Sequence, residues 1–154
     1  MEENLEKKML EEFKYVADED TQKELGQVWT PFETVQTMLD FIDEDKLKRE
    51  GATFLDPTLG SGNIILYILI KKIVEYNHEP IGALKSCFGV EYEEDTLKHA
   101  KERIANFMKT KTDEDVSEII DHNFVHSSIF DWDIKNWCKS ESAHTSQLDL
   151  FFIE

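Results

Sequence analysis

A short apolar run that breaks into a glycine-containing turn constrains the fold of this chain most. The run reads Phe54-Leu55-Asp56-Pro57-Thr58-Leu59-Gly60-Ser61-Gly62, and an apolar segment of helical length follows it from near Asn63. A strand, a glycine turn and a helix in this order bring backbone N–H groups and the positive end of a helix beside the turn. The stretch therefore predicts a nucleotide-binding loop. The alternative is a strand-to-helix turn that needs glycine only for its positive φ.

The spacing within this loop excludes two common kinds of nucleotide site. A dinucleotide-binding fingerprint would place Gly or Ala at position 65, where Ile65 stands. A phosphate loop would need a Gly-Lys-Ser/Thr sequence, and the stretch has no Lys. The pattern Asp-Pro-x-x-Gly-Ser-Gly is instead associated with S-adenosylmethionine, which is the cofactor we expect.

The composition indicates one acidic domain. With 154 residues the chain is long enough to bury a core but short for a complete α/β enzyme. The net charge of -16 gives a surface that repels phosphate, so the chain alone should bind DNA poorly. No apolar run reaches membrane-spanning length, the N-terminus lacks signal-peptide features, and Cys87 and Cys138 form no metal or redox motif. We therefore expect a cytoplasmic protein with no metal site and no membrane contact.

Two segments precede the loop. Residues 2–17 carry apolar residues at helical spacing, which predicts a separate N-terminal helical segment at 1–24 and a binding domain at 25–154. A second helix is predicted from about residue 31 to 43–45, with its apolar side chains on one face, namely Val35, Met38, Leu39 and Ile42.

The start of this second helix has a structural and a functional interpretation. Thr30 is a suitable N-cap, Pro31 occupies the first helical position, and Glu33 completes a capping box. Capping alone can explain Thr30 and Pro31. The functional interpretation adds that the helix start and the preceding Trp29 offer N–H donors and a flat apolar wall to an amino-acid carboxylate.

Three strands and two crossover helices are predicted for the rest of the chain. The strands are expected at 53–56, 86–92 and 123–126, and the helices at 63–76 and 93–110. The connecting segments are predicted as a charged linker at 43–51, a turn at 77–82, and a loop or short surface helix at 109–121.

Glu91 ends the second predicted strand. A carboxylate at this point of a nucleotide-binding βαβ unit can accept hydrogen bonds from both ribose hydroxyls. The alternative is an exposed acid in the first turn of the next helix, although Glu93, Glu94 and Asp95 already supply that charge.

Other polar residues give weaker signals. His122 and His126 are four residues apart, and in extended chain this spacing separates them too far for one metal ion. Asp131 and Asp133 are paired acids without an assigned substrate, so we interpret residues 127–137 as a solvated turn.

Taken together, these segments resemble the adenine-specific (N6) DNA methyltransferases, notably the modification subunits of type I and combined restriction-modification enzymes. The likeness covers about residues 20–154. The family's Gly-Gln-aromatic-aromatic-Thr-Pro segment is matched at 26–31, with Val28 in place of the first aromatic residue. The family's Asp-Pro-Ala-Cys-Gly-Ser-Gly loop is matched at 56–62 in five of seven positions. The resemblance implies an α/β, three-layer S-adenosylmethionine-dependent methyltransferase (Rossmann-like) fold. Its parallel strands would lie in the order three, two, one, four.

The resemblance also implies a cofactor site over the carboxyl ends of these strands. The segment that carries Trp29, Thr30 and Pro31 would contact the methionine end, and Asp56 and Gly60 would face the amino-acid part. The family acid of the second strand falls on Glu91. The remaining cofactor-binding positions carried over from the family are Pro57, Thr58, Gly62, Tyr92, which would lie against adenine, and Ser128.

Two departures from the family pattern qualify this site. Ser128 stands where the family has an Asp that hydrogen-bonds the adenine amino group, so we expect weaker cofactor binding. The apolar run Leu148-Asp149-Leu150-Phe151-Phe152-Ile153 resembles the fourth strand, which in the family runs into Asn-Pro-Pro-Tyr, and no Asn-Pro-Pro-aromatic sequence occurs in this chain. The fold is therefore expected to be truncated after the fourth strand.

These expectations favour a cofactor-binding methyltransferase module that is not catalytic alone. It would reach DNA only through a partner or a missing region, and the apolar run at 148–153 would join a protein partner because an unpaired apolar strand needs a neighbour. Two alternatives stay open. One is a non-enzymatic acidic binder that regulates a restriction-modification system. The other is a self-sufficient methyltransferase that acts on a substrate other than DNA.

Overall fold

The computed structural model of the chain describes residue 30 and residues 32–141. Trp29, Pro31, the predicted helical segment at 1–24 and the apolar run at 148–153 lie outside the described residues. The predicted domain boundaries and the predicted fourth strand therefore stay predictions.

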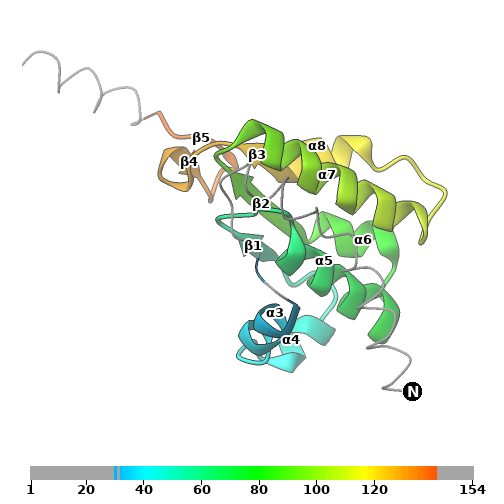
Figure 1. The fold of residues 1–154 in the computed structure, drawn as a ribbon. Coiled ribbons are helices and arrows are strands. Elements are labelled where there is room, and N and C mark those ends of the chain that lie inside the picture. The colour runs from blue at the N-terminus through cyan, green and yellow to red at the C-terminus, as the bar shows by residue number, and fades with distance from the viewer. Residues whose placement is uncertain (1–29, 31, 142–154) are drawn as a thin grey trace, which may run out of the picture.

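A three-stranded parallel sheet lies at the centre of the described region (Figure 1). Its strands are β1 (Phe54–Asp56), β2 (Cys87–Glu91) and β3 (Phe124–His126), and their order is β1-β2-β3. All three predicted strands are confirmed within two residues at each end, and so is the predicted order three, two, one. In the register, Asp56 lies opposite Gly89, and Glu91 lies opposite His126. The carboxyl ends of the strands therefore meet at one edge of the sheet.

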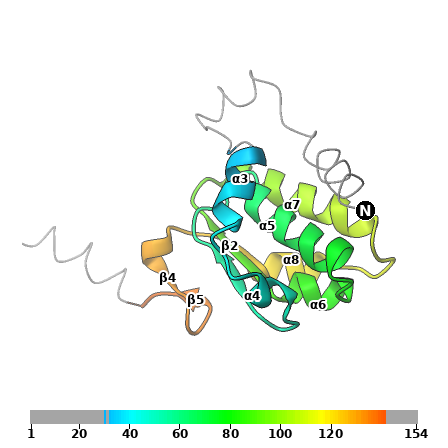
Figure 2. The same ribbon diagram turned by 90° about the horizontal axis from the view of Figure 1, so that it is seen from below.

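The two predicted crossover helices are present and lie against the sheet (Figures 1 and 2). The first is α5 (Asn63–Ile70), which continues as the π-helical turn η1 (Lys71–Glu75), and the second is α7 (Glu94–Lys109). In α5 every residue except Ile64 is buried, so this apolar helix is covered on more than one side. α7 buries an apolar stripe that includes Leu97, Ala100, Ile104 and Phe107.

Helix α3 (Phe32–Leu39) packs on α5 (Figure 2). It begins within a residue of the predicted start but ends earlier than predicted. Val35 and Leu39 are buried as expected, whereas Met38 is 49% exposed and Ile42 lies beyond the end of the helix. Ile42 still packs, partly buried, against the core, so the predicted apolar face is wrong at Met38 and the helix is shorter than predicted.

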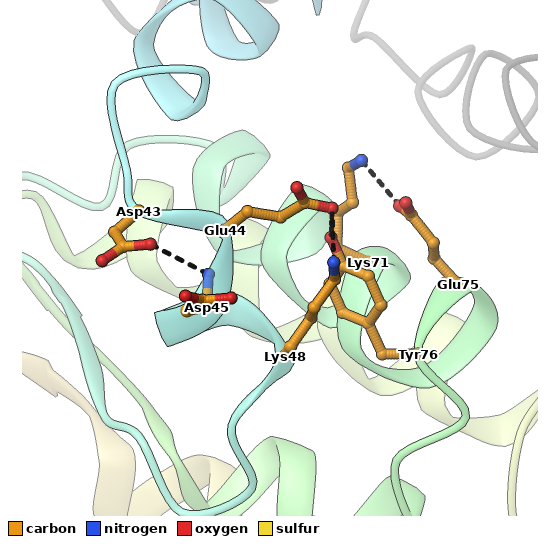
Figure 3. Close-up of polar contacts among 7 residues, drawn as sticks. All are labelled: Asp43, Glu44, Asp45, Lys48, Lys71, Glu75 and Tyr76. Carbon is orange, nitrogen blue, oxygen red and sulfur yellow. Dashed lines mark hydrogen bonds and ion pairs between the residues drawn. The ribbon is translucent and has the colours of Figure 1, made fainter.

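The prediction of a charged linker at 43–51 is wrong, because α4 (Glu44–Lys48) forms there. The Asp43 side chain caps this helix by accepting a hydrogen bond from the backbone N–H of Asp45 (3.0 Å), and Leu47 is buried beneath it. The Tyr76 hydroxyl bonds Glu44 (3.2 Å), which also pairs with Lys48 (3.1 Å) (Figure 3). A cap, one buried leucine and these contacts to the end of η1 are enough to hold a single helical turn.

Two further short helices close the amino end of the sheet. The segment predicted as a turn at 77–82 contains the start of α6 (Pro80–Lys85), because Glu79 caps it and Pro80 fits the first helical position. The segment left open as a loop or short helix contains α8 (Ser117–Asn123). Asn123 is buried, and its Nδ2 donates to the carbonyl oxygens of Leu84, Lys85 and Cys87. This side chain ties α8 to α6 and β2.

The predicted solvated turn at 127–137 is a more ordered element than expected. It forms the 3-10 turn η2 (Ile129–Asp131) and then a hairpin of β4 (Trp132–Asp133) and β5 (Cys138–Lys139). Trp137 meets the rings of Phe88 and Trp132 edge-on, at centroid distances of 4.8 and 5.4 Å. These aromatic contacts attach the hairpin to β2.

Candidate functional site

The predicted loop follows β1 directly and has the glycine conformations that the sequence requires. Gly60 has a φ of 54° and Gly62 a φ of 84°, which side chains other than glycine rarely adopt. A Cβ atom at Gly62 would also lie 3.5 Å from the Cβ atom of Ala100 in α7. Pro57 and Thr58 are exposed at the outer rim of the loop.

β2 holds this loop by both backbone and side-chain contacts. The Leu59 N–H donates to the Val90 carbonyl oxygen (2.9 Å), and the Leu59 side chain is buried. A Cβ atom at Gly89 would lie 2.8 Å from Leu59 Cδ1 and 3.0 Å from Phe124 Cδ1. Gly89 is thus a site-building residue that sequence reasoning missed. The sequence signal for this role was a glycine inside an apolar strand, because such a glycine often marks a point where another part of the molecule comes close to the backbone.

Glu91 is the side chain that joins the loop to the end of β2. Its Oε2 accepts a hydrogen bond from the Gly60 backbone N–H (2.7 Å), and its Oε1 accepts one from the Glu93 N–H (2.9 Å). The residue is buried and precedes α7, so the alternative of an exposed acid in the first helical turn is wrong. Each carboxylate oxygen has a second lone pair that a ligand hydroxyl can use.

Asp56 adds a second buried carboxylate at the same edge. Its Oδ1 accepts from the Thr58 N–H (3.1 Å). Burial raises the pKa of Asp56, the negative charge of Glu91 raises it further, and the Thr58 hydrogen bond opposes both effects. Within the described part of the chain, the ion pairs are Lys48–Glu44, Lys71–Glu75 and Lys101–Asp121, so neither Asp56 nor Glu91 has a cationic side chain in a salt bridge. This edge of the sheet therefore favours a ligand group with positive charge. It disfavours a phosphate group.

A buried polar network lies behind the loop and was not predicted from the sequence. Asn63 Nδ2 donates to the Thr30 carbonyl oxygen (2.8 Å). Arg103 Nη1 donates both to Asn63 Oδ1 (2.7 Å) and to the Ser61 carbonyl oxygen (2.7 Å). Asn63, Ser61 and Arg103 are 6%, 5% and 6% exposed. The network brings Thr30, the one described residue of the predicted Trp29-Thr30-Pro31 segment, to the glycine loop.

The third strand contributes backbone and hydroxyl groups at the same edge. His126 Nε2 lies 2.7 Å from the Tyr92 carbonyl oxygen, and the Ser127 N–H donates to the Glu91 carbonyl oxygen (3.0 Å). Tyr92 is 69% exposed, which leaves its ring open to a ligand. Ser128 caps η2, and its Oγ accepts from the Phe130 N–H (3.3 Å).

The predicted site residues that the structure describes thus gather at the carboxyl edge of the sheet. Gly60 and Glu91 are joined by a hydrogen bond, the Glu91 charge acts on Asp56, and Thr30 is tied to the end of the loop through Asn63. Tyr92 and Ser128 follow the paired ends of β2 and β3. Trp29 and Pro31 lie outside the described residues.

No metal site or membrane span is found within the described residues. No group of three or more His, Cys, Asp or Glu side chains there can hold an ion. His122 lies in α8 and not in the predicted strand, and its Nδ1 is 2.7 Å from Asn123 Oδ1. None of the helices in residues 32–141 is long and apolar enough to cross a membrane.

The sequence matches a known protein family. The family model described as N-6 DNA Methylase matches residues 9–140, which is most of the chain. No curated protein and no solved structure matched the sequence. The family implies an S-adenosylmethionine-dependent methyltransferase fold, and the small parallel sheet with its covering helices agrees with that class. The predicted resemblance is confirmed: the chain belongs to the N-6 DNA methylase family.

Proposed function

We propose that this chain is the S-adenosylmethionine-binding module of a DNA adenine methyltransferase of the restriction-modification type. The observation that carries the proposal is the placement of Asp56 and Glu91. These two buried carboxylates lie at the ends of neighbouring strands, on either side of a glycine loop whose Gly60 N–H is bonded to Glu91.

The charges of the site support this cofactor over a nucleotide phosphate. S-adenosylmethionine carries an ammonium and a sulfonium group, and either can offset the negative charge that Asp56 and Glu91 concentrate at the edge. In the proposed pose, Asp56 faces the ammonium group and Glu91 accepts from the ribose hydroxyls. The helix start at Thr30 and the loop at Gly60 hold the rest of the amino-acid part.

The adenine end of the cofactor would lie beside β3. The exposed Tyr92 ring offers a flat apolar surface, and the Ser128 hydroxyl offers a neutral hydrogen-bond acceptor. A neutral acceptor binds an amino group less strongly than a carboxylate does, so the proposed affinity is lower than that of a family member with Asp at this position.

When bound, the cofactor would supply the methyl group, but the adenine acceptor needs its own binding groups. The 154 residues contain no Asn-Pro-Pro sequence, and the net charge of -16 opposes contact with a DNA backbone. We therefore propose that the groups that hold the target adenine, and most of the DNA contacts, come from another segment or chain. The apolar run at 148–153 is the proposed attachment point for such a partner.

Calorimetric titration of S-adenosylmethionine into the wild-type protein and into Asp56→Ala tests the proposal. We expect saturable binding to the wild type and a loss of at least about tenfold in affinity for Asp56→Ala. Asp113→Ala removes an exposed acidic side chain that is not one of the proposed site residues. This control variant should bind the cofactor with the affinity of the wild type.

The acidic-binder alternative makes the opposite prediction. If neither the wild type nor the variants bind the cofactor, the proposed function fails. The net charge of -16 then favours a protein that competes with DNA for a basic cleft. A pull-down against modification and specificity subunits would test that alternative.

A further inference from the structure

We infer that Asn63 and Arg103 are positioning residues for the amino-acid half of the cofactor site. This inference rests on the proposed function, because it assigns these two residues to the binding of that cofactor. It goes beyond that function because it makes a buried link between Thr30 and the glycine loop responsible for the affinity of the site for ligands that carry an amino-acid group.

The hydrogen bonds around Asn63 fix the orientation of its side chain. Its side chain lies between a carbonyl oxygen of Thr30 and the guanidinium group of Arg103. A carbonyl only accepts and a guanidinium only donates, so the amide has one satisfactory orientation, with Nδ2 toward Thr30 and Oδ1 toward Arg103. Asn is therefore well matched to this position, since it supplies a donor and an acceptor at once.

Asn63 is the first residue of α5 and follows Gly62 of the loop, while Thr30 lies 33 residues earlier in the chain. Arg103 reaches the same point from the middle of α7 and also holds the Ser61 carbonyl oxygen. The network thus fixes the Thr30 and Ser61 carbonyl groups relative to each other.

In the proposed function the helix start after Thr30 and the loop at Gly60 share the amino-acid part of the cofactor. A small shift between two binding segments weakens every contact that needs both of them. In the proposed pose the ribose and adenine contacts come from Glu91, at the end of β2, and from Tyr92, the residue after it, and not from Thr30.

Ligands with and without the amino-acid part test this inference. S-adenosylhomocysteine carries that part and 5′-methylthioadenosine lacks it, so the ratio of their dissociation constants reports on the amino-acid half alone. Asn63→Asp keeps an acceptor for Arg103 but removes the donor to Thr30. We expect this variant to bind S-adenosylhomocysteine about tenfold or more weakly, with binding of 5′-methylthioadenosine unchanged. Asn63→Ala, which adds no charge, should change the ratio in the same direction.

A matched control separates this role from general stabilisation. Asn123 is also a buried Asn whose Nδ2 donates to backbone carbonyl oxygens, but it lies at the amino end of the sheet. Asn123→Asp should lower the thermal midpoint and leave the ratio of dissociation constants unchanged. Arg103→Met should change the ratio as Asn63→Ala does. If Arg103→Met does not fold, the two Asn63 variants alone test the inference.

The outcomes distinguish this inference from the proposed function. If the wild type binds both ligands and the Asn63 variants weaken both equally, or neither, the inference is overturned while the proposed function stands. If the ratio also changes in Asn123→Asp, the link is only structural and the inference is overturned as well. If the wild type binds neither ligand, the proposed function itself fails.

Discussion

The Glu91 carboxylate, at the end of β2, accepts a 2.7 Å hydrogen bond from the backbone N–H of Gly60, in the loop that follows β1. The same carboxylate bonds the Glu93 N–H, so one side chain holds both the glycine loop and the start of α7. Two backbone donors on one buried carboxylate make this contact a charge-assisted joint between the first two βα units of the sheet.

Glu91→Gln should loosen this joint. A Gln amide has one acceptor oxygen, so it can accept from either Gly60 or Glu93 but turns its NH2 group toward the other donor. We expect the free energy of unfolding to fall by about 1–3 kcal/mol, measured by urea denaturation. Glu93→Gln, at the exposed neighbour, should change it little. Equal effects for the two variants would contradict the structural role of Glu91.

Gly89→Ala should disturb the loop through Leu59. The added methyl group would lie 2.8 Å from Leu59 Cδ1, and both Leu59 and Phe124 are buried and cannot move freely. We expect a loss of about 1–3 kcal/mol in the free energy of unfolding. Gly82→Ala, where the methyl group meets only the end of the Glu79 side chain, should cost less.

A double-mutant cycle checks that Leu59 is the cause. In a Leu59→Ala background the nearer clash partner is absent and Phe124 Cδ1, at 3.0 Å, remains, so Gly89→Ala should cost less than in the wild type. Additive effects of the two substitutions would show that the Gly89 position is sensitive for another reason.

Asp56→Asn should separate binding from stability. The pKa of Asp56 is raised above its ordinary value of 3.8, first by burial and then by Glu91. The Asp56 carboxyl group therefore binds its proton more tightly in the folded state than in the unfolded state. The stability that this protonated carboxyl group contributes at low pH is lost as the pH rises through the raised pKa. Asn keeps the oxygen that accepts from Thr58 and carries no charge.

The stability of Asp56→Asn relative to the wild type should accordingly increase as the pH rises from about 4 to 7. Denaturant midpoints of both proteins over this range would measure the difference. Cofactor affinity should fall in the same variant, because the charge that faces the ammonium group is gone. A difference in stability that is constant with pH would contradict the raised pKa.

The two thiols should differ sharply in reactivity. Cys87 is fully buried at the start of β2, and burial raises the pKa of its thiol to about 11, whereas Cys138 is exposed. At pH 8 an aromatic disulfide reagent should label one thiol rapidly and the second only as the protein unfolds. Cys138→Ser should remove the rapid phase. Two rapid thiols in the wild type would contradict the packing of β2.

The loop and the strand ends were predictable from the sequence because their signals are local. Gly60 and Gly62 need positive φ, and Glu91 follows an apolar strand-length run, so the type and order of these elements are encoded within a few residues. Helix α4 was missed because its local signals, the Asp43 cap and the Glu44–Lys48 pair, are weak in so short a helix. Its further contacts come from Tyr76 and His78, about 30 positions later.

The polar network was missed for a similar reason. Arg103 lies on the buried stripe of α7, between Ala100 and Ile104, and a charged residue within such a stripe was the one signal that could have indicated it. Its partners, Ser61 and Asn63, are about 40 residues away in sequence. Hydrogen bonds across that separation depend on the packing of α7 against the loop, which spacing alone does not specify.

The central claim is that S-adenosylmethionine binds over the carboxyl ends of β1 and β2. The most direct test is to titrate it into the 15N-labelled protein and follow the backbone amide signals by NMR. We predict saturable shifts that are largest for residues 56–62 and 91–93, with little change in the β4–β5 hairpin. No saturable shift, or the largest shifts far from Gly60 and Glu91, would contradict the claim.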